Sequence, residues 1–555
     1  MYQPPDENSH SPYAGRWVAI VRGRVVAQGG TPESALRASQ AARHKEKPEI
    51  KFMPLPMNLP PILEKIITAF PPEADVHLVG GAVRDMLTNR LSPDFDFAVP
   101  SGAISLARAV ANSLNADFMV LDEERDTGRV ILTNEDKSFV YLDFAAYRGE
   151  TLEEDLRDRD FTINALALNL RDVSIIDPLN GGTDIRAKVI RACSPTSLLH
   201  DPVRILRAVR QAAAFGFTID KNTRELMKQA ASQIGNVSIE RLRDEIFKML
   251  GGPKASASMR ALEMLGVLPY LMPELLKMKG VTQSPPHIHD VWTHTLAVLD
   301  QLDHLLTSSL RLDFDPEKTS DMFMGFVSLK IGRYREQFAS HFATPLNPNR
   351  SHRSLLFFAA LYHDICKPDT KSIDENGRIR FFDHDVKGAD VIAERARSLN
   401  LSNDEVERLQ KIVLHHMRIH FFADRLEKEN QPPSRKAIYR FFRDSEAAGV
   451  DLVLLALADV RGTKGNDITQ DTWTAYLEIA RILLENYWER PQEIVDPPRL
   501  INGNDLMNEL QLKPGKLIGQ LLEAIRENQA AGKITDREQA LAFAREELAK
   551  GMSET

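Results

Sequence analysis

Two hydrophobic periods divide the chain. Apolar and polar positions alternate over residues 16–29, which predicts two short strands, and TPESALRASQAARH then predicts a helix with Thr31 as its N-cap. Strand and helix patterns alternate from about 61 to 190, whereas nearly every later segment has the 3.6-residue period of a helix. The pattern predicts an α+β chain in which a sheet-containing part precedes a long helical part.

The length of 555 residues exceeds what one hydrophobic core supports, so we expect several domains. Shifts in pattern and a proline-rich stretch suggest their boundaries. We expect a small ββα module of unknown role (1–50), a linker (51–60), a head mixing strands and helices (61–192), a helical neck and body (193–285), a second helical domain rich in histidine (286–465) and a helical tail (466–555).

Composition excludes several classes of protein. Hydrophobic residues make up 43% and charged residues 27%, which is ordinary for a globular protein, and no apolar run approaches the length of a membrane span. The first twenty residues contain no apolar signal-peptide region. Only Cys193 and Cys366 occur, so we expect no disulfide framework and a cytoplasmic location.

The charge is uneven along the chain. The net charge is 70 − 78 = −8, but residues 186–248 carry twelve Lys and Arg against six Asp and Glu, a local excess of six positive charges. A basic face of this size suits a partner rich in phosphate, such as RNA, although a solvated helix surface is the commoner meaning of a charge run.

The stretch HLVGGAVRDMLTNRLSPDFDFAVP contains the first candidate site. On a strand, Asp94 and Asp96 share one face while the intervening phenylalanines point to the core. Two adjacent carboxylates repel unless a cation lies between them, and Mg²⁺ prefers oxygen ligands and substrate phosphates. The preceding glycine turn suits phosphate, and Asp143 lies in a strand-like run that could supply a third carboxylate. The alternative is a surface Asp-x-Asp pair without function.

Further blocks follow in order: RDFTINALAL (159–168), IIDPLNGGTDIRAKVIRA (175–192) and DPVRILRAVRQAAAFGF (201–217). With GGAVRD and DFD, this set resembles the class II tRNA nucleotidyltransferase and bacterial poly(A) polymerase family over about residues 75–275. The resemblance implies a polymerase-β-like mixed-sheet head followed by an all-α neck and body. It also implies template-independent addition of C, C and A, or part of that sequence, to the tRNA 3′ end from CTP and ATP, with release of pyrophosphate.

The same resemblance assigns roles to residues. Asp94 and Asp96 would hold two Mg²⁺ that activate the RNA 3′-hydroxyl for attack on the α-phosphate, and Asp143, from its place in a strand-like run, is the candidate third catalytic carboxylate. Asp201 and Arg204 would read the edge of the incoming base by hydrogen bonds, and the basic helices after them would meet the acceptor stem. The full nucleotide-binding set that the resemblance implies is Gly80, Gly81, Arg84, Arg159, Asp160, Asn164, Asp201, Arg204, Arg207 and Arg210.

Two positions depart from the family pattern. The family usually has Glu immediately before Asp201, where this chain has His200, and Arg is frequent where this chain has Asp158. The first departure puts switching between CTP and ATP in question, and the second could weaken a phosphate contact.

The second candidate site is a series of histidines and aspartates in helix-like segments over residues 287–459. Such N and O ligands from separate helices suit a first-row metal, and a metal-bound water would be a hydrolytic nucleophile. A single buried His is more often a core residue, but five segments in this order resemble the HD-domain phosphohydrolase superfamily. That resemblance implies two divalent transition-metal sites, for Ni, Mn, Fe or Co: one held by His294, His363, Asp364 and Asp459, and one completed by His384 and His415, with His416 as the alternative to His415.

Competing functions remain at this stage. A poly(A) polymerase is expected to have a strongly basic tail, and this tail is mixed in charge. An enzyme that adds only CC or only A is a further alternative that one sequence does not exclude. An HD phosphohydrolase whose head merely binds RNA is the alternative from another class, and the presence of Asp94 and Asp96 argues against it. The HD domain itself is expected to act on a phosphoester such as a 2′,3′-cyclic phosphate, a 2′-nucleotide or a damaged tRNA end.

Overall fold

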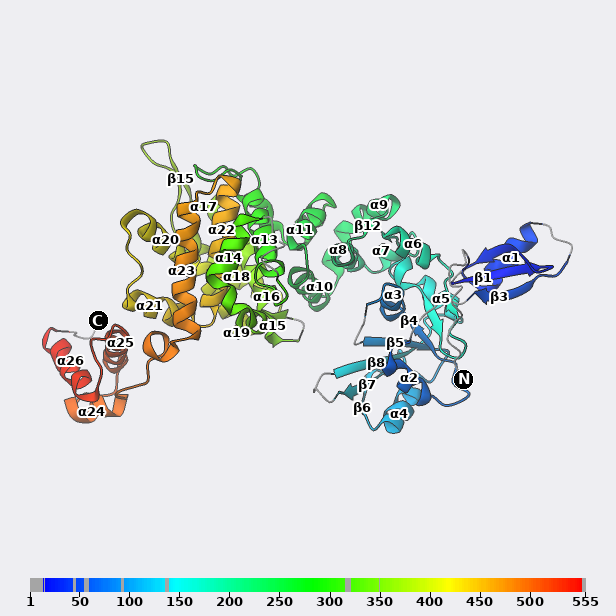
Figure 1. Cartoon of the computed structure of the whole chain (residues 1–555), viewed down its shortest axis with the longest axis horizontal. Helices are drawn as coiled ribbons and strands as arrows, with labels where there is room; N and C mark the ends of the chain where they lie inside the picture. Colours follow the sequence, from blue (N-terminus) through cyan, green and yellow to red (C-terminus); the bar gives the residue numbers. More distant parts are fainter. Residues whose placement is uncertain are drawn as a thin grey trace. The chain divides into compact units, whose positions relative to one another are not determined.

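The computed structural model describes residues 13, 15–42, 46–53, 59–90, 94–134, 139–314, 321–348 and 350–551. The chain divides into two compact units, Met1–Val237 and Ser238–Thr555 (Figure 1). The boundary falls inside the segment 193–285 that the sequence assigned to neck and body. The proline-rich positions 54–58 and the first twelve residues lie outside the described residues.

The N-terminal module contains one strand more than predicted. Strands β1 (Arg16–Val21) and β2 (Arg24–Gly29) and helix α1 (Pro32–Ala41) are as expected, with the Thr31 side chain accepting from the amide of Ser34. Strand β3 (Glu49–Met53) pairs antiparallel with β1, giving the order β2-β1-β3. Strand β3 crosses the predicted boundary at 50/51 and includes the first three residues that the sequence assigned to the linker. This five-residue strand alternates only briefly before a run of prolines, which dominated the sequence pattern.

The module packs against the head of the same unit. The indole nitrogen of Trp17 donates to the carbonyl of Ile175 at 2.9 Å, and the amide of Asp177 donates to the carbonyl of Gly30 at 2.7 Å. A Cβ at Gly30 would lie 1.6 Å from the Asp177 carbonyl oxygen, so glycine is required at this contact.

The head contains the predicted mixed sheet, with seven strands in the order β10-β9-β4-β5-β8-β7-β6. Strands β5 and β8 run parallel and the other neighbours antiparallel. The strands are β4 (His77–Val79), β5 (Asp94–Val99), β6 (Asp117–Asp122), β7 (Thr127–Thr133), β8 (Phe139–Ala146), β9 (Ala167–Asn169) and β10 (Ile175–Ile176).

One face of this sheet is packed. Helix α4 (Ala103–Leu114) lies against β7 and β8, and helix α2 (Pro61–Thr68) precedes Phe70. The rings of Phe97 and Phe144 stack at 4.8 Å, and Phe70 meets both edge-on. The alternate residues of β5 and β8 therefore lie on the opposite face.

Short helices complete the first unit: α3 (Gly81–Leu87), α5 (Leu152–Arg157), η1 (Thr162–Asn164), α6 (Gly181–Ala187), α7 (Ser197–His200), α8 (Arg204–Phe215), α9 (Lys221–Ala230) and η2 (Ala231–Asn236). A short parallel pair, β11 (Val189–Ile190) and β12 (Thr218–Ile219), connects the strand-rich part to these helices.

The second unit is almost entirely helical. Its α-helices are α10 (Ile239–Gly251), α11 (Ala255–Met264), α12 (Leu268–Leu271), α13 (Val291–Thr307), α14 (Met322–Ile331), α15 (Arg335–Ala343), α16 (His352–Tyr362), α17 (Lys367–Thr370), α18 (His384–Ser398), α19 (Asn403–His415), α20 (Arg418–Glu429), α21 (Arg435–Ser445), α22 (Ala448–Lys464), α23 (Gln470–Trp488), α24 (Gly503–Leu510), α25 (Lys516–Ala530) and α26 (Arg537–Ala549).

Helix α22 forms the centre of the second unit. It is apolar on nearly all sides and buried from Ala448 to Thr463, as expected for a helix enclosed by others. It packs along α13 and also contacts α19 and α23. The last three helices bury a separate core around Leu506, Leu521 and Ala540. Among the described residues, no helix is long and apolar enough to cross a membrane.

Candidate functional site

Three predicted carboxylates lie on the open face of the head sheet. Asp96 is directly opposite Asp143 on the parallel strand β8, and Asp94 is opposite Tyr141. Residues opposite one another on neighbouring strands share a face, and so do alternate residues on one strand. The fold thus gathers Asp94, Asp96 and Asp143 as the sequence anticipated.

An arginine that the sequence reasoning missed extends this row. Arg129 on β7 is opposite Asp143 and donates through Nε and Nη2 to its two carboxylate oxygens, each at 2.7 Å. Protein atoms around the Asp96 carboxyl and the nearby carboxylates of Asp143 and Asp94 raise its pKa, while Arg159 and Arg129 oppose this shift. Asp96 stays accessible to solvent. A cation close to Asp94 and Asp96 would relieve the repulsion, so the donor set fits Mg²⁺.

The glycine turn after β4 lies next to these carboxylates. Gly80 has φ 73°, and a Cβ there would lie 2.8 Å from Nη1 of Arg159 and 3.6 Å from Oδ2 of Asp96. Arg159 is held by Asp155 at 3.0 Å. Gly81 begins α3. The turn therefore brings backbone, one guanidinium and one carboxylate together.

Four of the predicted nucleotide-binding residues form one hydrogen-bonded network, in which Arg84, Asp160 and Asn164 are buried. Nη1 of Arg84 donates to Oδ1 of Asn164 at 2.5 Å, and the Asn164 amide donates to Asp160 at 2.9 Å. Arg207 donates to the other Asp160 oxygen, also at 2.9 Å, and Asn164 reaches Gln211 at 3.1 Å. Burial would raise the pKa of Asp160, but Arg207 and Asn164 lower it, and the net shift is downward. The network joins α3, η1 and α8 behind the turn.

The predicted base-reading pair is adjacent but not directed to solvent. Nη1 of Arg204 donates to the carbonyl of Arg159 at 3.1 Å and to the hydroxyl of Ser197 at 2.7 Å, and Nη2 donates to the carbonyl of Asp158 at 2.9 Å. Its Nε lies 3.6 Å from Asp201. Arg204, Arg207 and Arg210 follow one another at three-residue spacing on α8, and of these three Arg204 is the buried one.

His200 ends the short helix α7 and is exposed. Its position next to Asp201 leaves the Arg204 contacts intact. The departure from the family's usual Glu at this position therefore changes an exposed residue next to the base-reading pair.

The histidines and aspartates of the second unit form two adjacent groups. Within each group the potential ligand atoms lie within 4.8 Å of one another: His294, His363 and Asp459 in one, and Asp364, His384 and His416 in the other, all buried. Nε2 of His294 lies 3.1 Å from Asp459, and Asp364 lies 3.3 Å from Nε2 of His363. Helices α13, α16, α18, α19 and α22 end at or pass through this point.

The histidine orientations fit metal binding. Nδ1 of His363, His384 and His416 lies 2.7, 2.8 and 2.6 Å from the carbonyl oxygens three residues earlier. Each bond places the proton on Nδ1, which leaves the Nε2 lone pair facing the cluster. Nε2 of His294 and of His363 are buried without a hydrogen-bond partner in the described part of the chain, whereas Oδ2 of Asp364 lies 2.7 Å from Nζ of Lys367. Unpartnered lone pairs facing one another are a donor set suited to a divalent metal.

His416 takes the place that the sequence assignment gave to His415. The two residues follow one another at the end of α19, where successive side chains point about 100° apart, so only one of them faces the cluster. His416 is 2% exposed and its Nε2 lies 3.2 Å from that of His384. His415 lies outside both groups.

The sequence reasoning also missed residues that support the cluster. Nε2 of His420 lies 2.9 Å from Oδ2 of Asp459, and its Nδ1 lies 2.6 Å from the Tyr476 hydroxyl. Lys367 places Nζ 2.7 Å from Asp364. Burial would raise the pKa of Asp364, but His363 and Lys367 hold it well below its usual value. His420 and Lys367 each lie four residues after a cluster histidine, a spacing that could have suggested them.

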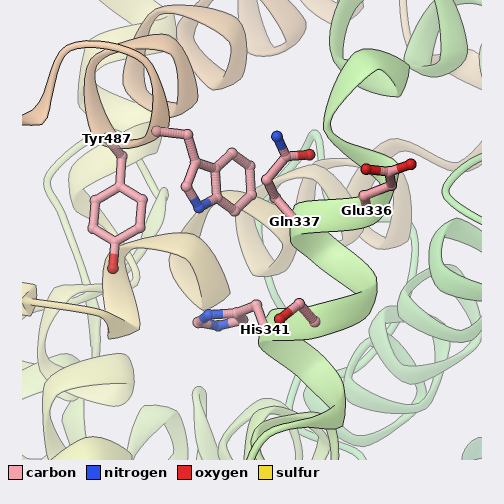
Figure 2. A pocket seen from close by; sticks show the side chains of 6 residues that line it. Glu336, Gln337, His341 and Tyr487 are labelled. Atoms are coloured by element: carbon pink, nitrogen blue, oxygen red, sulfur yellow. The ribbon is translucent and has the colours of Figure 1, made fainter.

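A cavity of about 440 Å³ in the same unit is separate from the cluster. It is lined by Glu336, Gln337, Ser340, His341, Tyr487 and Trp488 (Figure 2). Behind it, Nε2 of His341 lies 3.2 Å from Asp451, which also pairs with Arg408. Asp451 and Asp459 are both on α22, about 12 Å apart along its axis. None of the residues that line the cavity belongs to the two ligand groups.

Comparisons with known proteins match segments of both units of the chain. Family models match as "Poly A polymerase head domain" (76–191), "Probable RNA and SrmB- binding site of polymerase A" (216–278), HD domain (327–448) and tRNA nucleotidyltransferase domain 2 (474–544). The A-adding tRNA nucleotidyltransferase of Deinococcus radiodurans is 32% identical over 85% of this chain and 95% of its own length. This chain belongs to the tRNA nucleotidyltransferase and poly(A) polymerase family.

Other members of the family differ in what their names record. The CC-adding tRNA nucleotidyltransferase of Synechocystis sp. is 31% identical over 86% of this chain and 95% of its own length. A CCA-adding enzyme in apo form shares the fold, with a TM-score of 0.54 at 20% identity over 90% of this chain and 96% of that chain. Residues 10–54 match a family of unknown function. The sequence relatives thus include A-adding and CC-adding enzymes, and the fold is shared with a CCA-adding enzyme.

Proposed function

We propose that this protein adds C, C and A, or part of that sequence, to the 3′ end of tRNA from CTP and ATP and releases pyrophosphate. The observation that carries the proposal is the row of Asp94, Asp96 and Asp143 on the open sheet face beside the Gly80 turn. The names of its relatives, A-adding and CC-adding tRNA nucleotidyltransferases, support the same substrate class.

In this proposal the carboxylates bind the metal and the turn binds the triphosphate. Asp94 and Asp96 would hold Mg²⁺, which when bound supplies positive charge to the reacting phosphate and favours ionisation of the RNA 3′-hydroxyl. Asp143 is paired with Arg129, so it contributes either as a further metal ligand or by holding that guanidinium near the reacting phosphate. Arg159 lies over the Gly80 turn, where a guanidinium can bind the triphosphate.

Base selection is proposed for Asp201 and Arg204. A carboxylate accepts from the exocyclic amine that C and A share, and a guanidinium donates to ring N and O atoms. Three of the five N–H groups of Arg204 donate to two backbone carbonyls and Ser197, so two remain for a base without loss of these acceptors. Ser197→Ala would remove one of them while leaving Arg204 itself in place.

The test is nucleotide addition to three tRNA transcripts that end before the CCA, after the first C, and after CC. Each receives CTP, ATP, UTP or GTP singly and CTP with ATP, with Mg²⁺, and the products are separated on a sequencing gel. Ordered addition of C, C and A that then stops supports the full reaction. Addition of CC alone or A alone identifies a specialist. Open-ended addition of A indicates a poly(A) polymerase, and no addition to any transcript contradicts the proposal.

For the second unit we propose metal-dependent phosphoester hydrolysis. The supporting observation is the set of buried Nε2 and carboxylate atoms gathered in two groups, in which Nε2 of His294 and of His363 have no hydrogen-bond partner in the described part of the chain. His294, His363, His384 and His416 with Asp364 and Asp459 would hold divalent Ni, Mn, Fe or Co, which when bound activates water. Hydrolysis of 2′,3′-cyclic AMP, 2′-AMP and a tRNA ending in a 2′,3′-cyclic phosphate, each with and without added metal, tests this. Metal-independent activity or none with any metal contradicts it.

A further inference from the structure

The open face of the head sheet carries more than the carboxylates. Phe139 and Tyr141 are on the same side of β8 as Asp143, because alternate residues of a strand share a face. Met119 on β6 is opposite Arg129, which is itself opposite Asp143, so Met119 shares this face as well. We call Met119, Arg129, Phe139 and Tyr141 the platform.

The platform is accessible. Phe139 is 50% and Met119 45% exposed, while Val140 and Leu142, the alternate residues of β8, are buried. The guanidinium of Arg129 lies 5.0 Å from the centre of the Tyr141 ring, and its side chain is 32% exposed. Large apolar side chains exposed on an open sheet face, with the guanidinium of Arg129 among them, are typical of a binding surface.

The platform also adjoins the reacting groups. Tyr141 is the residue directly opposite Asp94, one strand spacing away, and Phe139 lies two residues farther along β8. When the RNA 3′-hydroxyl is at Asp94 and Asp96, the nucleotides that precede it must leave across a neighbouring surface. The platform starts at those carboxylates, and its rings and guanidinium match the two chemical parts of a single strand, bases and phosphates.

We infer that the platform binds the single-stranded 3′-terminal nucleotides of the RNA substrate, with bases stacked on Tyr141 and Phe139 and a phosphate at Arg129. This inference rests on the proposed function of the head. Stacking on aromatic side chains tolerates any base, which suits a 3′ end whose last nucleotide changes as addition proceeds.

The test is RNA binding by the full-length protein without nucleotide or divalent metal, measured by fluorescence anisotropy. The probe is an acceptor-stem hairpin with a single-stranded 3′ tail, compared with the same hairpin ending flush. The variant Phe139→Ala/Tyr141→Ala should weaken binding of the tailed hairpin about tenfold or more, because each stacked base contributes appreciably, and that of the flush hairpin less than twofold. Arg129→Gln should weaken the tailed hairpin alone in the same way.

The control is Phe421→Ala, which removes a similarly exposed ring (63%) from α20 and should change neither affinity. Unchanged binding of the tailed hairpin, or equal losses for both hairpins, overturns the inference. A shift in oligomeric state of Phe139→Ala/Tyr141→Ala by light scattering, without the selective loss, assigns the face to a second copy of the chain and also overturns it.

Failure of the platform and failure of the proposed function are distinguishable. A wild-type protein that adds nothing to any tRNA end contradicts the proposed function, whatever the hairpin affinities are. A wild-type protein that adds nucleotides, while Phe139→Ala/Tyr141→Ala binds the tailed hairpin normally, contradicts only the platform.

Discussion

At the scale of single residues, Asp459 shows how the metal centre is supported from outside. One of its oxygens faces His294, and the other faces His420, which in turn contacts the Tyr476 hydroxyl. Groups that orient a metal ligand typically change metal affinity 10–100-fold when removed. His420→Ala should therefore weaken Mn²⁺ binding about 10–100-fold by titration calorimetry, and Tyr476→Phe should weaken it less.

His415→Ala is the matched control for that experiment, because it removes a histidine next to the cluster that lies outside both groups. It should leave the affinity near that of the wild type. A normal affinity in His420→Ala, or an equal loss in His415→Ala, would show that Asp459 does not depend on His420.

A second residue-scale prediction concerns acid stability. Burial, with the nearby charge of Arg408, lowers the pKa of His352 to about 4, against the partial opposition of Asp451; His341 also disfavours its protonation. In the unfolded chain its pKa is 6.5, so lowering the pH protonates the unfolded state first. The contribution of neutral His352 to the free energy of unfolding is complete above pH 6.5. It is lost as the pH falls towards 4, by at most about 3 kcal/mol.

His352→Gln should therefore reduce the loss of stability between pH 7 and pH 5, measured as the shift of the urea midpoint of the second unit. The exposed His304, replaced in the same way, should leave the shift unchanged. Identical pH dependence in the wild type and His352→Gln would contradict the argument.

These residues also show what sequence could and could not supply at this scale. Asp94 and Asp96 were predictable as a pair because a strand has a strict period of two, and Asp143 was a candidate because it lies in a strand-like run. Choosing between His415 and His416 needed the rotation of α19, and Arg129 needed the register of β7 against β8. The local hydrophobic pattern predicts neither the rotation of a helix about its axis nor the pairing of distant strands.

At the scale of elements, the turn between β4 and α3 is the most constrained. Gly80 has φ 73°, which a side chain rarely adopts, and an added Cβ would meet Arg159 at 2.8 Å. Gly80→Ala should cost about 1–3 kcal/mol of stability in the first unit and weaken ATP binding, measured by urea denaturation and titration calorimetry.

Gly325→Ala is the comparison, since Gly325 is inside α14 and a Cβ added there would have nothing within 4 Å. Alanine favours a helix over glycine, so this variant should be neutral or stabilised by up to about 1 kcal/mol. A Gly80→Ala protein as stable as the wild type would show that the turn can adopt another conformation.

Long elements with clear caps and periodicity were predicted better than short strands. The helix after Thr31 was expected because the cap, the proline and the periodicity agree, and the structure contains it. Strand β3 was missed because five residues before a proline run carry little signal, and its partner β1 is about thirty residues away in the chain. Strands β10, β11 and β12 are two residues long and depend on tertiary pairing.

At the scale of the whole molecule, the two units carry different chemistry. The carboxylate row belongs to Met1–Val237 and both histidine groups belong to Ser238–Thr555. The resemblance carried by the sequence motifs anticipated this division of chemistry. Ordered motifs indicate the family even though they do not locate the boundary between the two units. It did not anticipate a role for the N-terminal module, whose strands match only a family of unknown function.

The central claim is that nucleotide addition belongs to the head carboxylates and phosphoester hydrolysis to the histidine groups. The most direct measurement compares Asp94→Ala and His363→Ala in both reactions, with circular dichroism to verify folding. We predict that Asp94→Ala loses addition of C or A to tRNA by at least about a thousandfold and keeps metal-dependent hydrolysis of 2′,3′-cyclic AMP, and that His363→Ala does the reverse. Loss of both activities in either folded variant, or unimpaired nucleotide addition in Asp94→Ala, would contradict the account.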